Sequence, residues 1–504
     1  MSVASPTAQT PPNEEQDWSP RLILSLFALI SVVEALTMSY MMVSTSIPLI
    51  SGHYQTTQGA WLITSGLLVG AVVSPLVGKL ADTHGKRRLL VICIGITILG
   101  SVISAVAPNF SIMLLGRAIS GVFFVTLFLG YSLVRDVFPS KTIPLAVAIV
   151  TSGSGVIAIP MPFISGWVLD SFGFRSVFWI IAGILTASAT LILATTPESP
   201  IRLRSTIDPV GAVLLGTGIG GVLIALSFGN SWGWDNTSTL AYLLGGIVLL
   251  LTWIASARYI SEPLIDLRLF AQRPVILIAV GAGFCYGIGA LVAVVLPTMV
   301  MTPGALGLGY GFGSDAKGVA LYQAPLAALT VIGGIVAGVL IGRNLRPRVL
   351  MIASMFLFVV GGMAMAVAHD QKIYVILFAM VIGFATGIGY AAIPNLQIEA
   401  VPAQLQASTA SMVSVFQSMF GAILPVIAFS IMNSHIAMAM EGSVVYSDDA
   451  IKYAWLLLAM SALLGTAATF LLPRRIVQLV VPPEQSAVLA PNGAASAPAT
   501  SGRE

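Results

Sequence analysis

Residues 59–107 read GAWLITSGLLVGAVVSPLVGKLADTHGKRRLLVICIGITILGSVISAVA. Two apolar runs, 59–78 and 89–107, flank a short polar loop that carries an acid and a basic cluster. A helix needs about 20 apolar residues to cross a hydrocarbon core about 30 Å thick. The stretch therefore predicts two membrane-spanning helices joined by a tight connection at one membrane face.

The composition of the whole chain extends this prediction. The chain has 504 residues, of which 57% are hydrophobic and only 9% are charged, whereas a soluble domain has about 25% charged residues. So few charges cannot provide a soluble surface for a chain of this length. A soluble enzyme, a nucleic-acid-binding protein and a disordered scaffold are excluded, and an all-α integral membrane protein is predicted.

Apolar runs of spanning length recur along the chain. They are continuously apolar and do not alternate, so helices are predicted and barrel strands are not. The sequence predicts fourteen spans, at roughly residues 22–50, 59–78, 89–107, 112–134, 144–168, 175–195, 208–228, 239–257, 274–297, 317–341, 348–368, 373–394, 407–431 and 453–473.

The positions of the basic residues support this count. With the N-terminus in the cytoplasm, 18 of the 23 lysines and arginines lie in cytoplasmic segments, as the positive-inside rule expects. The outside segments hold four, and Arg117 lies inside a span. Both termini are therefore predicted to be cytoplasmic, and the chain is predicted to be a multi-pass protein of the plasma (cytoplasmic or inner) membrane.

Arrangements of residues typical of catalysis or cofactor binding are absent from the sequence. The four histidines have no metal-like spacing, Cys93 and Cys285 lie in separate apolar runs, and no Gly-x-x-x-x-Gly-Lys-Ser/Thr loop occurs. We therefore predict no enzyme activity, no metal and no cofactor. Transport driven by ATP is disfavoured, which leaves an ion gradient or passive conduction.

Two charges lie within predicted spans, Glu34 in the first and Arg117 in the fourth. Each costs about 2.5–3.5 kcal/mol at the bilayer centre on an insertion scale. Counted from the span ends, both lie at a similar depth, about 20 Å from the cytoplasmic face. They are predicted to form either a static buried ion pair or a proton-titrating acid beside a cation.

The loop between the second and third spans carries a distinct pattern of glycines and charges. Glycines flank an acid, and a basic cluster follows. A short hairpin of this kind allows the acid to cap a helix N-terminus, while the basic residues pair with carboxylates or lipid phosphates. We call this stretch the signature loop; its residues are Gly78, Asp82, Gly85, Lys86, Arg87 and Arg88.

The signature loop resembles the loop between helices two and three of the major facilitator superfamily. Thr83 stands where that family usually has a basic residue. Arg117-Ala-Ile-Ser-Gly121 resembles the Arg-x-x-Gln-Gly motif of its fourth helix, with Ser120 in place of the Gln. The resemblance implies a role for Arg117 in proton coupling.

The fifth span resembles the exporter motif Gly-x-x-x-Gly-Pro-x-x-Gly-Gly of antiporters. Met161 and Ser165 stand at two of the glycine positions. Prolines and small residues also give a pliable, closely packed helix. The residues that carry the match are Gly155, Pro160, Pro162 and Gly166.

Three further stretches resemble the fourteen-helix drug:proton antiporter family of this superfamily, in the region of its two inserted helices. They are Asp208-Pro-Val-Gly211, Trp232-Gly-Trp234 and the run from Glu262 to Arg273. The resemblance covers residues 22–475. That family commonly has an Asp in helix one, but Ser39 stands at the position, and Glu34 lies five residues earlier.

The resemblance implies two six-helix pseudo-repeats with two extra helices between them, rocking about a midplane site. The predicted domains are a cytoplasmic polar tail at 1–20, an N-terminal six-helix bundle at 21–195, linker helices with flanking loops at 196–273, a C-terminal six-helix bundle at 274–475 and a low-complexity cytoplasmic tail at 476–504.

The implied function is proton-coupled export of small amphipathic or lipophilic compounds, as in multidrug efflux and antibiotic resistance. Asn395 and Gln417 are candidates for the ligand cavity. The expected partners are the substrate, protons and the lipid bilayer, with no nucleic acid, and the chain is expected to act as a monomer. Two alternatives remain: a dedicated exporter of an endogenous lipid, siderophore or antibiotic, and a non-transporting sensor or channel-like subunit.

Overall fold

The computed structural model describes most of the predicted membrane part of the chain. The described residues are 19–138, 159–199, 208–260, 263, 267, 272–401, 406–440 and 443–473. The predicted tails at 1–20 and 476–504 therefore lie almost wholly outside them.

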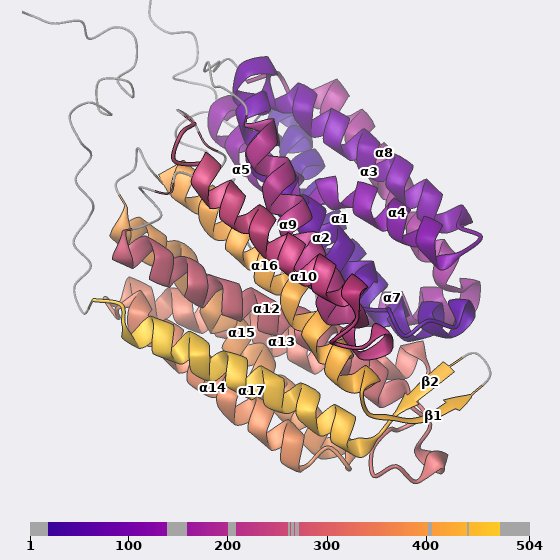
Figure 1. Cartoon of the computed structure of the whole chain (residues 1–504). Helices are drawn as coiled ribbons and strands as arrows, with labels where there is room; N and C mark the ends of the chain where they lie inside the picture. The colour runs from indigo at the N-terminus through magenta and orange to yellow at the C-terminus, as the bar shows by residue number, and fades with distance from the viewer. Residues whose placement is uncertain are drawn as a thin grey trace, which may run out of the picture.

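Within these residues the chain forms a bundle of long helices (Figure 1). Eleven of the described helices are long and apolar enough to cross a membrane. The first part contains α1 (Pro20–Tyr54), α2 (Trp61–His84), α3 (Lys86–Val106), α4 (Phe110–Ser120), the 3-10 turn η1 (Gly121–Phe124), α5 (Val125–Val137), α7 (Met161–Phe172) and α8 (Phe174–Thr195).

Two helices follow, α9 (Pro209–Trp232) and α10 (Thr237–Ser256). The last part contains α12 (Arg273–Met301), the 3-10 turn η2 (Gly304–Leu306), α13 (Ala316–Gly342), α14 (Pro347–Val367), α15 (Lys372–Ala400), α16 (Gln406–Asn433), β1 (Ile436–Met440), β2 (Ser443–Tyr446) and α17 (Asp448–Phe470).

Local sequence explains where several helices begin and end. The side chains of Asn109 and Asp208 accept hydrogen bonds from the amides of Ile112 and Gly211, which satisfies N–H groups at the starts of α4 and α9. Gly85 separates α2 from α3 with φ of 111°, a conformation that favours glycine. The predicted tight connection between the second and third spans is therefore a single glycine between two helices.

The fourth predicted span is not one regular helix, because η1 separates α4 from α5. At this point Gly121 packs directly against α2, and a Cβ atom on Gly121 would lie 2.4 Å from the carbonyl oxygen of Gly66. The two glycines therefore allow the helix backbones to approach closely, as small residues do in membrane proteins.

The first and last parts of the bundle use matching pairs of helices. In the first part α3 packs on both α4 and α8, and α1 packs on α8. In the last part α14 packs on both α15 and α17, and α12 packs on α17. We call the two parts the N-half (α1 to α8) and the C-half (α12 to α17).

Three main helix pairs join the halves: α1 with α12, α2 with α16, and α7 with α13. The helix α9 packs against both α2 and α16, and α10 packs on α9. The two helices between the halves therefore cover the line along which the N-half and the C-half meet (Figure 1).

The antiparallel strands β1 and β2 form a hairpin that pairs Ile436 with Tyr446. The sequence did not predict it. In Figure 1 the hairpin lies at one end of the bundle, between the end of α16 and the start of α17. Asn433 at this end of α16 bonds to Thr57, just before α2 begins, so the signature loop at the other end of α2 lies at the opposite end of the bundle. We call this the hairpin end, and it corresponds to the predicted outer face.

Candidate functional site: buried charges, the signature loop and the contacts between the halves

Glu34 lies in the middle of α1 and is 4% exposed. Neither carboxylate oxygen has a hydrogen-bond partner among the described residues. An ionised carboxylate in this environment carries a large desolvation cost, whereas the neutral acid carries a much smaller one. These two features, burial and the lack of a partner among the described residues, make Glu34 the candidate proton-binding group.

Arg117 lies in α4 and is 7% exposed. Its Nε donates a hydrogen bond of 2.9 Å to the carbonyl oxygen of Leu62, which lies in the first turn of α2. A Cβ atom on Gly66 would lie 3.7 Å from an Nη atom of the same guanidinium. Arg117 therefore joins α4 to the outer part of α2.

The structure does not bring Glu34 and Arg117 together, so the predicted ion pair is wrong. Gly130 of α5 lies beside Val33, because a Cβ atom on Gly130 would be 3.7 Å from a methyl group of Val33. Arg117 is thirteen residues nearer the outer end, about 20 Å along the helix axis. The depth comparison failed because α1, with 35 residues, is longer than a bilayer core requires, so a residue's distance from the helix end does not measure its depth.

The signature loop is mostly helical. Gly78 and Asp82 lie within α2, Gly85 is the link, and Lys86 begins α3; the side chain of Asp82 lies outside the described part. The Lys86 ammonium lies 2.5 Å from a carboxylate oxygen of Asp136, near the end of α5, and both side chains are buried. The Ser199 hydroxyl donates to the same carboxylate at 2.6 Å.

A second carboxylate stabilises the start of α3. The two oxygens of Glu198, just after α8, accept hydrogen bonds of 2.9 and 3.0 Å from the backbone amides of Arg87 and Arg88. A negative charge at a helix N-terminus also interacts favourably with the helix dipole. The basic loop is thus tied by carboxylates to the ends of α5 and α8, and one end of the N-half is held as a unit.

The antiporter-like residues lie partly within the described chain. Pro160 precedes α7 and Pro162 lies in its first turn, while Gly155 lies outside the described residues. At Gly166 a Cβ atom would be 2.6 Å from the carbonyl oxygen of Ala316, so α7 and the start of α13 are in close backbone contact. The Asp170 carboxylate accepts hydrogen bonds from the amides of Ala316 and Lys317 at 3.3 and 3.0 Å.

Further polar contacts cross between the halves. Thr45 of α1 donates to the side-chain oxygen of Gln323 in α13 at 3.2 Å, and the Thr64 hydroxyl donates to the carbonyl oxygen of Ala422 at 3.1 Å. The Asn433 side chain donates to the carbonyl oxygen of Thr57 at 3.2 Å. Together with the Asp170 contacts, these bonds close the hairpin end of the interface between the halves.

The two candidate cavity residues are both partly buried. The Asn395 side chain donates to the carbonyl oxygen of Ala391 at 2.8 Å, within its own helix. Gln417 lies in the middle of α16. The rings of Tyr286 and Tyr390 stack between α12 and α15, with centroids 4.2 Å apart. The C-half therefore carries amide side chains in α15 and α16 and a stacked pair of tyrosine rings between α12 and α15.

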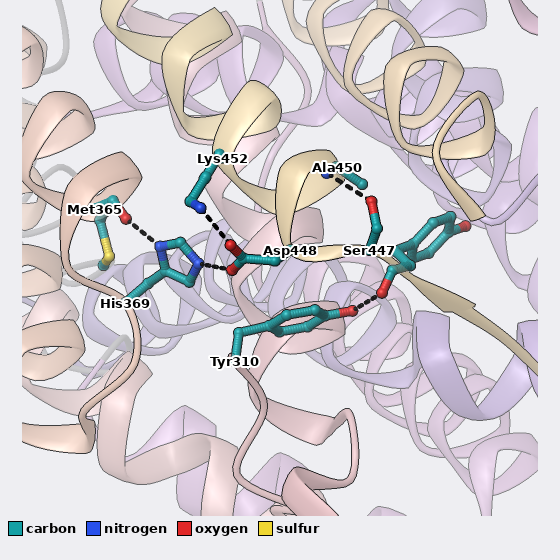
Figure 2. Close-up of polar contacts among 8 residues, drawn as sticks. Tyr310, Met365, His369, Ser447, Asp448, Ala450 and Lys452 are labelled. Carbon is teal, nitrogen blue, oxygen red and sulfur yellow. Dashed lines mark hydrogen bonds and ion pairs between the residues drawn. The ribbon is translucent and has the colours of Figure 1, made fainter. Parts of the chain in front are cut away.

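A polar cluster lies at the hairpin end of the C-half (Figure 2). We call this cluster the outer clasp; its members are Tyr310, His369, Asp448 and Lys452. His369 is 3% exposed, with Nδ1 2.8 Å from the carbonyl oxygen of Met365 and Nε2 2.8 Å from a carboxylate oxygen of Asp448. Because both nitrogens face acceptors, both bonds form only when the ring carries two protons. The other Asp448 oxygen pairs with Lys452.

The glycine-rich loop before α13 joins this cluster. The Tyr310 hydroxyl donates to the carbonyl oxygen of Tyr446 in β2 at 2.7 Å. Tyr310 is 3% exposed, and burial raises the pKa of Tyr310 to about 12, so its hydroxyl remains a donor. The clasp therefore joins the end of α14, the start of α17, the loop and the hairpin.

The sequence does not identify several of these residues as functional candidates. Asp136 and Glu198 lie close to span ends, where an acid is indistinguishable from an ordinary solvated charge. Gln323 and Asp170 contact groups more than 140 residues away in the chain. The one usable signal was the surplus of basic residues in the signature loop, which predicts acidic partners without identifying them. Among the described residues no group of His, Cys, Asp and Glu is arranged to hold a metal ion.

Comparison with known proteins identifies relatives of most of the membrane part. A family model described as Major Facilitator Superfamily matches residues 27–426. An uncharacterized MFS-type transporter of Mycobacterium tuberculosis is 25% identical over 66% of this chain and 48% of its own length, so the chain spans about half of that relative. Multidrug resistance protein 3 of Bacillus subtilis is 22% identical over 75% of this chain and 72% of that protein.

A further relative, the uridine/deoxyuridine transporter of Lactococcus lactis, is 28% identical over 77% of this chain and 82% of that protein. Among solved structures, a bacterial homolog of the human lysosomal transporter Spinster, in an inward-facing and unoccupied conformation, matches with a TM-score of 0.63 at 15% identity. It covers 90% of this chain and 98% of that chain. The fold and the family model agree, and the chain belongs to the Major Facilitator Superfamily.

Proposed function

We propose that this protein is a proton-coupled exporter of small amphipathic compounds, of the fourteen-helix drug:proton antiporter type. One observation carries the proposal: within a Major Facilitator fold, Glu34 is a buried carboxyl in the middle of α1 without a hydrogen-bond partner among the described residues. Such an intramembrane acid is costly to keep and marks a proton or ion pathway.

Glu34 is proposed to bind and release the coupled proton without a static counter-ion. Because Arg117 lies about 20 Å away along the bundle, it does not form an ion pair that would keep Glu34 ionised. Arg117 would instead act through the α2–α4 contact, where its guanidinium is bonded to the Leu62 carbonyl. Arg117 is therefore proposed to support coupling by positioning α4 against α2.

Alternating access is proposed to occur by rocking of the N-half against the C-half. The contacts of Thr45 with Gln323, Asn433 with Thr57 and Asp170 with the start of α13 join the halves at the hairpin end. This arrangement corresponds to a transporter closed on its outer side. Opening toward the outside would require these bonds to break, while the signature-loop contacts hold the other end of the N-half together.

The proposed architecture has two six-helix pseudo-repeats with α9 and α10 between them. Its support is that the pairs α3–α8 and α1–α8 of the N-half recur as α14–α17 and α12–α17 in the C-half. We further propose that both termini face the cytoplasm, that the protein lies in the plasma membrane and that it acts as a monomer without a cofactor.

The second candidate function is dedicated export of one endogenous compound. Its support is that the relatives include the transporter of an acurin A biosynthesis cluster in Aspergillus aculeatus. A dedicated exporter would use the same fold and the same proton site, with a narrower range of ligands.

The test is resistance and efflux in a pump-deficient cell challenged with a panel of toxic amphipathic compounds. The wild-type chain should protect against several of them, and Glu34→Gln should abolish protection at equal expression. Glu399→Gln is the matched control, because Glu399 is an exposed carboxylate near the end of α15. Full protection by Glu34→Gln would refute the assignment of Glu34, and protection against a single compound would favour the dedicated exporter.

A further inference from the structure

An open groove of about 460 Å³ lies between the start of α3 and the end of α8, outside the proposed transport path. Its lining residues are Arg87, Arg88, Val91, Ile92, Leu193 and Glu198. The groove combines two guanidinium groups at one end with aliphatic side chains along its walls. It lies at the end of the bundle predicted to face the cytoplasm.

The basic residues of the signature loop have different surroundings. Lys86 is committed to its buried ion pair with Asp136. Arg87 donates through one Nη atom to the Leu193 carbonyl at 2.6 Å, and its Nε has no hydrogen-bond partner among the described residues. Arg88 is exposed, and its side chain makes no hydrogen bond or ion pair with any described residue. Among the described residues, no carboxylate side chain therefore forms an ion pair with the guanidinium group of Arg87 or Arg88.

Glu198 offsets only one of the two positive charges of the groove. Both of its oxygens accept hydrogen bonds from the backbone amides of Arg87 and Arg88, so the carboxylate is directed at the helix start. The Ser199 amide also donates to one of these oxygens. Two guanidinium groups against one committed carboxylate leave the groove with a net positive charge, which favours an anionic group.

The apolar walls continue beyond the groove. Ile92, Ile96 and Leu99 are 45%, 38% and 57% exposed and follow one another at spacings of four and three residues, so they share one face of α3. Gly95 on this helix has open space above it. Leu193 of α8, 53% exposed, forms the facing wall. An extended hydrocarbon chain fits this strip, whereas a free phosphate or nucleotide would leave it uncovered.

We propose that this groove binds an anionic glycerophospholipid, with its phosphate at Arg88 and Arg87 and one acyl chain along Ile92, Ile96 and Leu99. Basic pockets between spanning helices on the cytoplasmic side commonly hold anionic head groups. The lipid would join α3 to α8 at the place where Glu198 already links them. The proposal does not depend on the transported substrate or on proton coupling.

The test is binding of phosphatidylglycerol to the purified full-length chain in neutral detergent, followed by native mass spectrometry. Arg88→Gln should weaken binding about fivefold, the effect of one basic residue near an anionic surface. Leu193→Trp, which fills the groove without changing charge, should also weaken it. Arg258→Gln is the control, because Arg258 is an exposed arginine just past α10, away from the groove.

Three results would overturn the proposal. The first is an equal effect of Arg88→Gln and Arg258→Gln, which would indicate nonspecific attraction to surface charge. The second is equally tight binding of phosphatidylcholine, which would remove the anionic class. The third is competition by inorganic phosphate together with unchanged binding in Leu193→Trp, which would identify a free phosphate. Because the assay measures no flux, none of these results bears on the proposed transport.

Discussion

At the scale of single residues, two buried charges are central to the proposed function: Glu34 in α1, which is 4% exposed, and Arg117 in α4, which is 7% exposed. Glu34 and Arg117 stood out because a charge in an apolar run is costly. Their separation depends on the position of α1 along α4 and α5, which is set by contacts such as that of Gly130 in α5 with Val33 in α1. No property of either residue's own segment encodes that contact, so the predicted pairing failed while the predicted burial was correct.

Gly121→Ala should destabilise the protein. The added methyl group would lie 2.4 Å from the Gly66 carbonyl oxygen, and backbone cannot move aside without separating α2 from η1. We expect a loss of about 1–3 kcal/mol in the free energy of unfolding, measured as a lower midpoint of thermal unfolding in detergent. Gly183→Ala is the control, because nothing lies within 4 Å of a Cβ atom there; equal losses in both variants would contradict the close approach.

His369→Ala should loosen the outer clasp. The substitution removes the imidazole contacts with the Met365 carbonyl and the Asp448 carboxylate, so that Lys452 is the one partner of Asp448 left in the outer clasp. The expected cost is about 1–3 kcal/mol, again measured by thermal unfolding. His84→Ala is the comparison, because His84 is exposed and bonds only within α2. The same unfolding midpoint in both variants would show that the outer clasp does not stabilise the fold.

At the scale of elements, most helices could be predicted because spanning length and apolar composition are local properties. Eleven described helices meet that criterion. The interruption of the fourth span at Gly121 and the β1–β2 hairpin could not be predicted in the same way. The interruption at Gly121 depends on the facing Gly66 of α2, in another part of the chain. The hairpin consists of two short strands between two spans, and a short apolar run can form either a strand or a piece of helix.

The link between α3 and α5 provides a prediction at this scale. Asp136→Asn removes the carboxylate that pairs with the buried Lys86 ammonium, and breaking a buried pair in this way costs about 3–5 kcal/mol. The variant should unfold at a clearly lower temperature. Replacing both residues, as Lys86→Met with Asp136→Leu, should recover much of that loss, because both charges of the pair are then removed. A double variant as unstable as Asp136→Asn would contradict the role of the charge pair.

At the scale of the whole molecule, the sequence predicted a helical bundle and a Major Facilitator fold, and the family match and the structural likeness agree with both. It did not predict that α9 packs across α2 and α16, because two isolated apolar segments carry no record of their partners. The sequence also did not predict the contacts that join the halves at the hairpin end. Asn433 and Thr57 are separated by 376 residues, and only the folded chain places them together.

Closure of the hairpin end can be tested by cross-linking. Thr57→Cys with Asn433→Cys should form a cross-link with a short bifunctional reagent, because the two residues are joined across the halves by a hydrogen bond of 3.2 Å. The cross-link should abolish transport if the halves must separate there. The native cysteines Cys93 and Cys285 are buried.

The control pair for that experiment lies within the N-half. The rings of His53 and Phe174 have centroids 5.1 Å apart, so His53→Cys with Phe174→Cys should cross-link without joining the halves. Transport should continue in this control. Continued transport in the cross-linked Thr57–Asn433 pair would contradict the proposed rocking motion.

The central claim is that Glu34 couples proton movement to export, and one measurement tests it most directly. Purified protein in liposomes, with the membrane potential clamped and no initial pH gradient, is given a permanently cationic compound that the chain exports from cells. Lumenal pH is followed with a trapped dye. Because such a compound carries no titratable proton, its entry through the wild-type protein should drive protons out and raise lumenal pH. Glu34→Gln should give no pH change, whereas an equal rise in both proteins, or compound entry without any pH change in the wild type, would contradict the account.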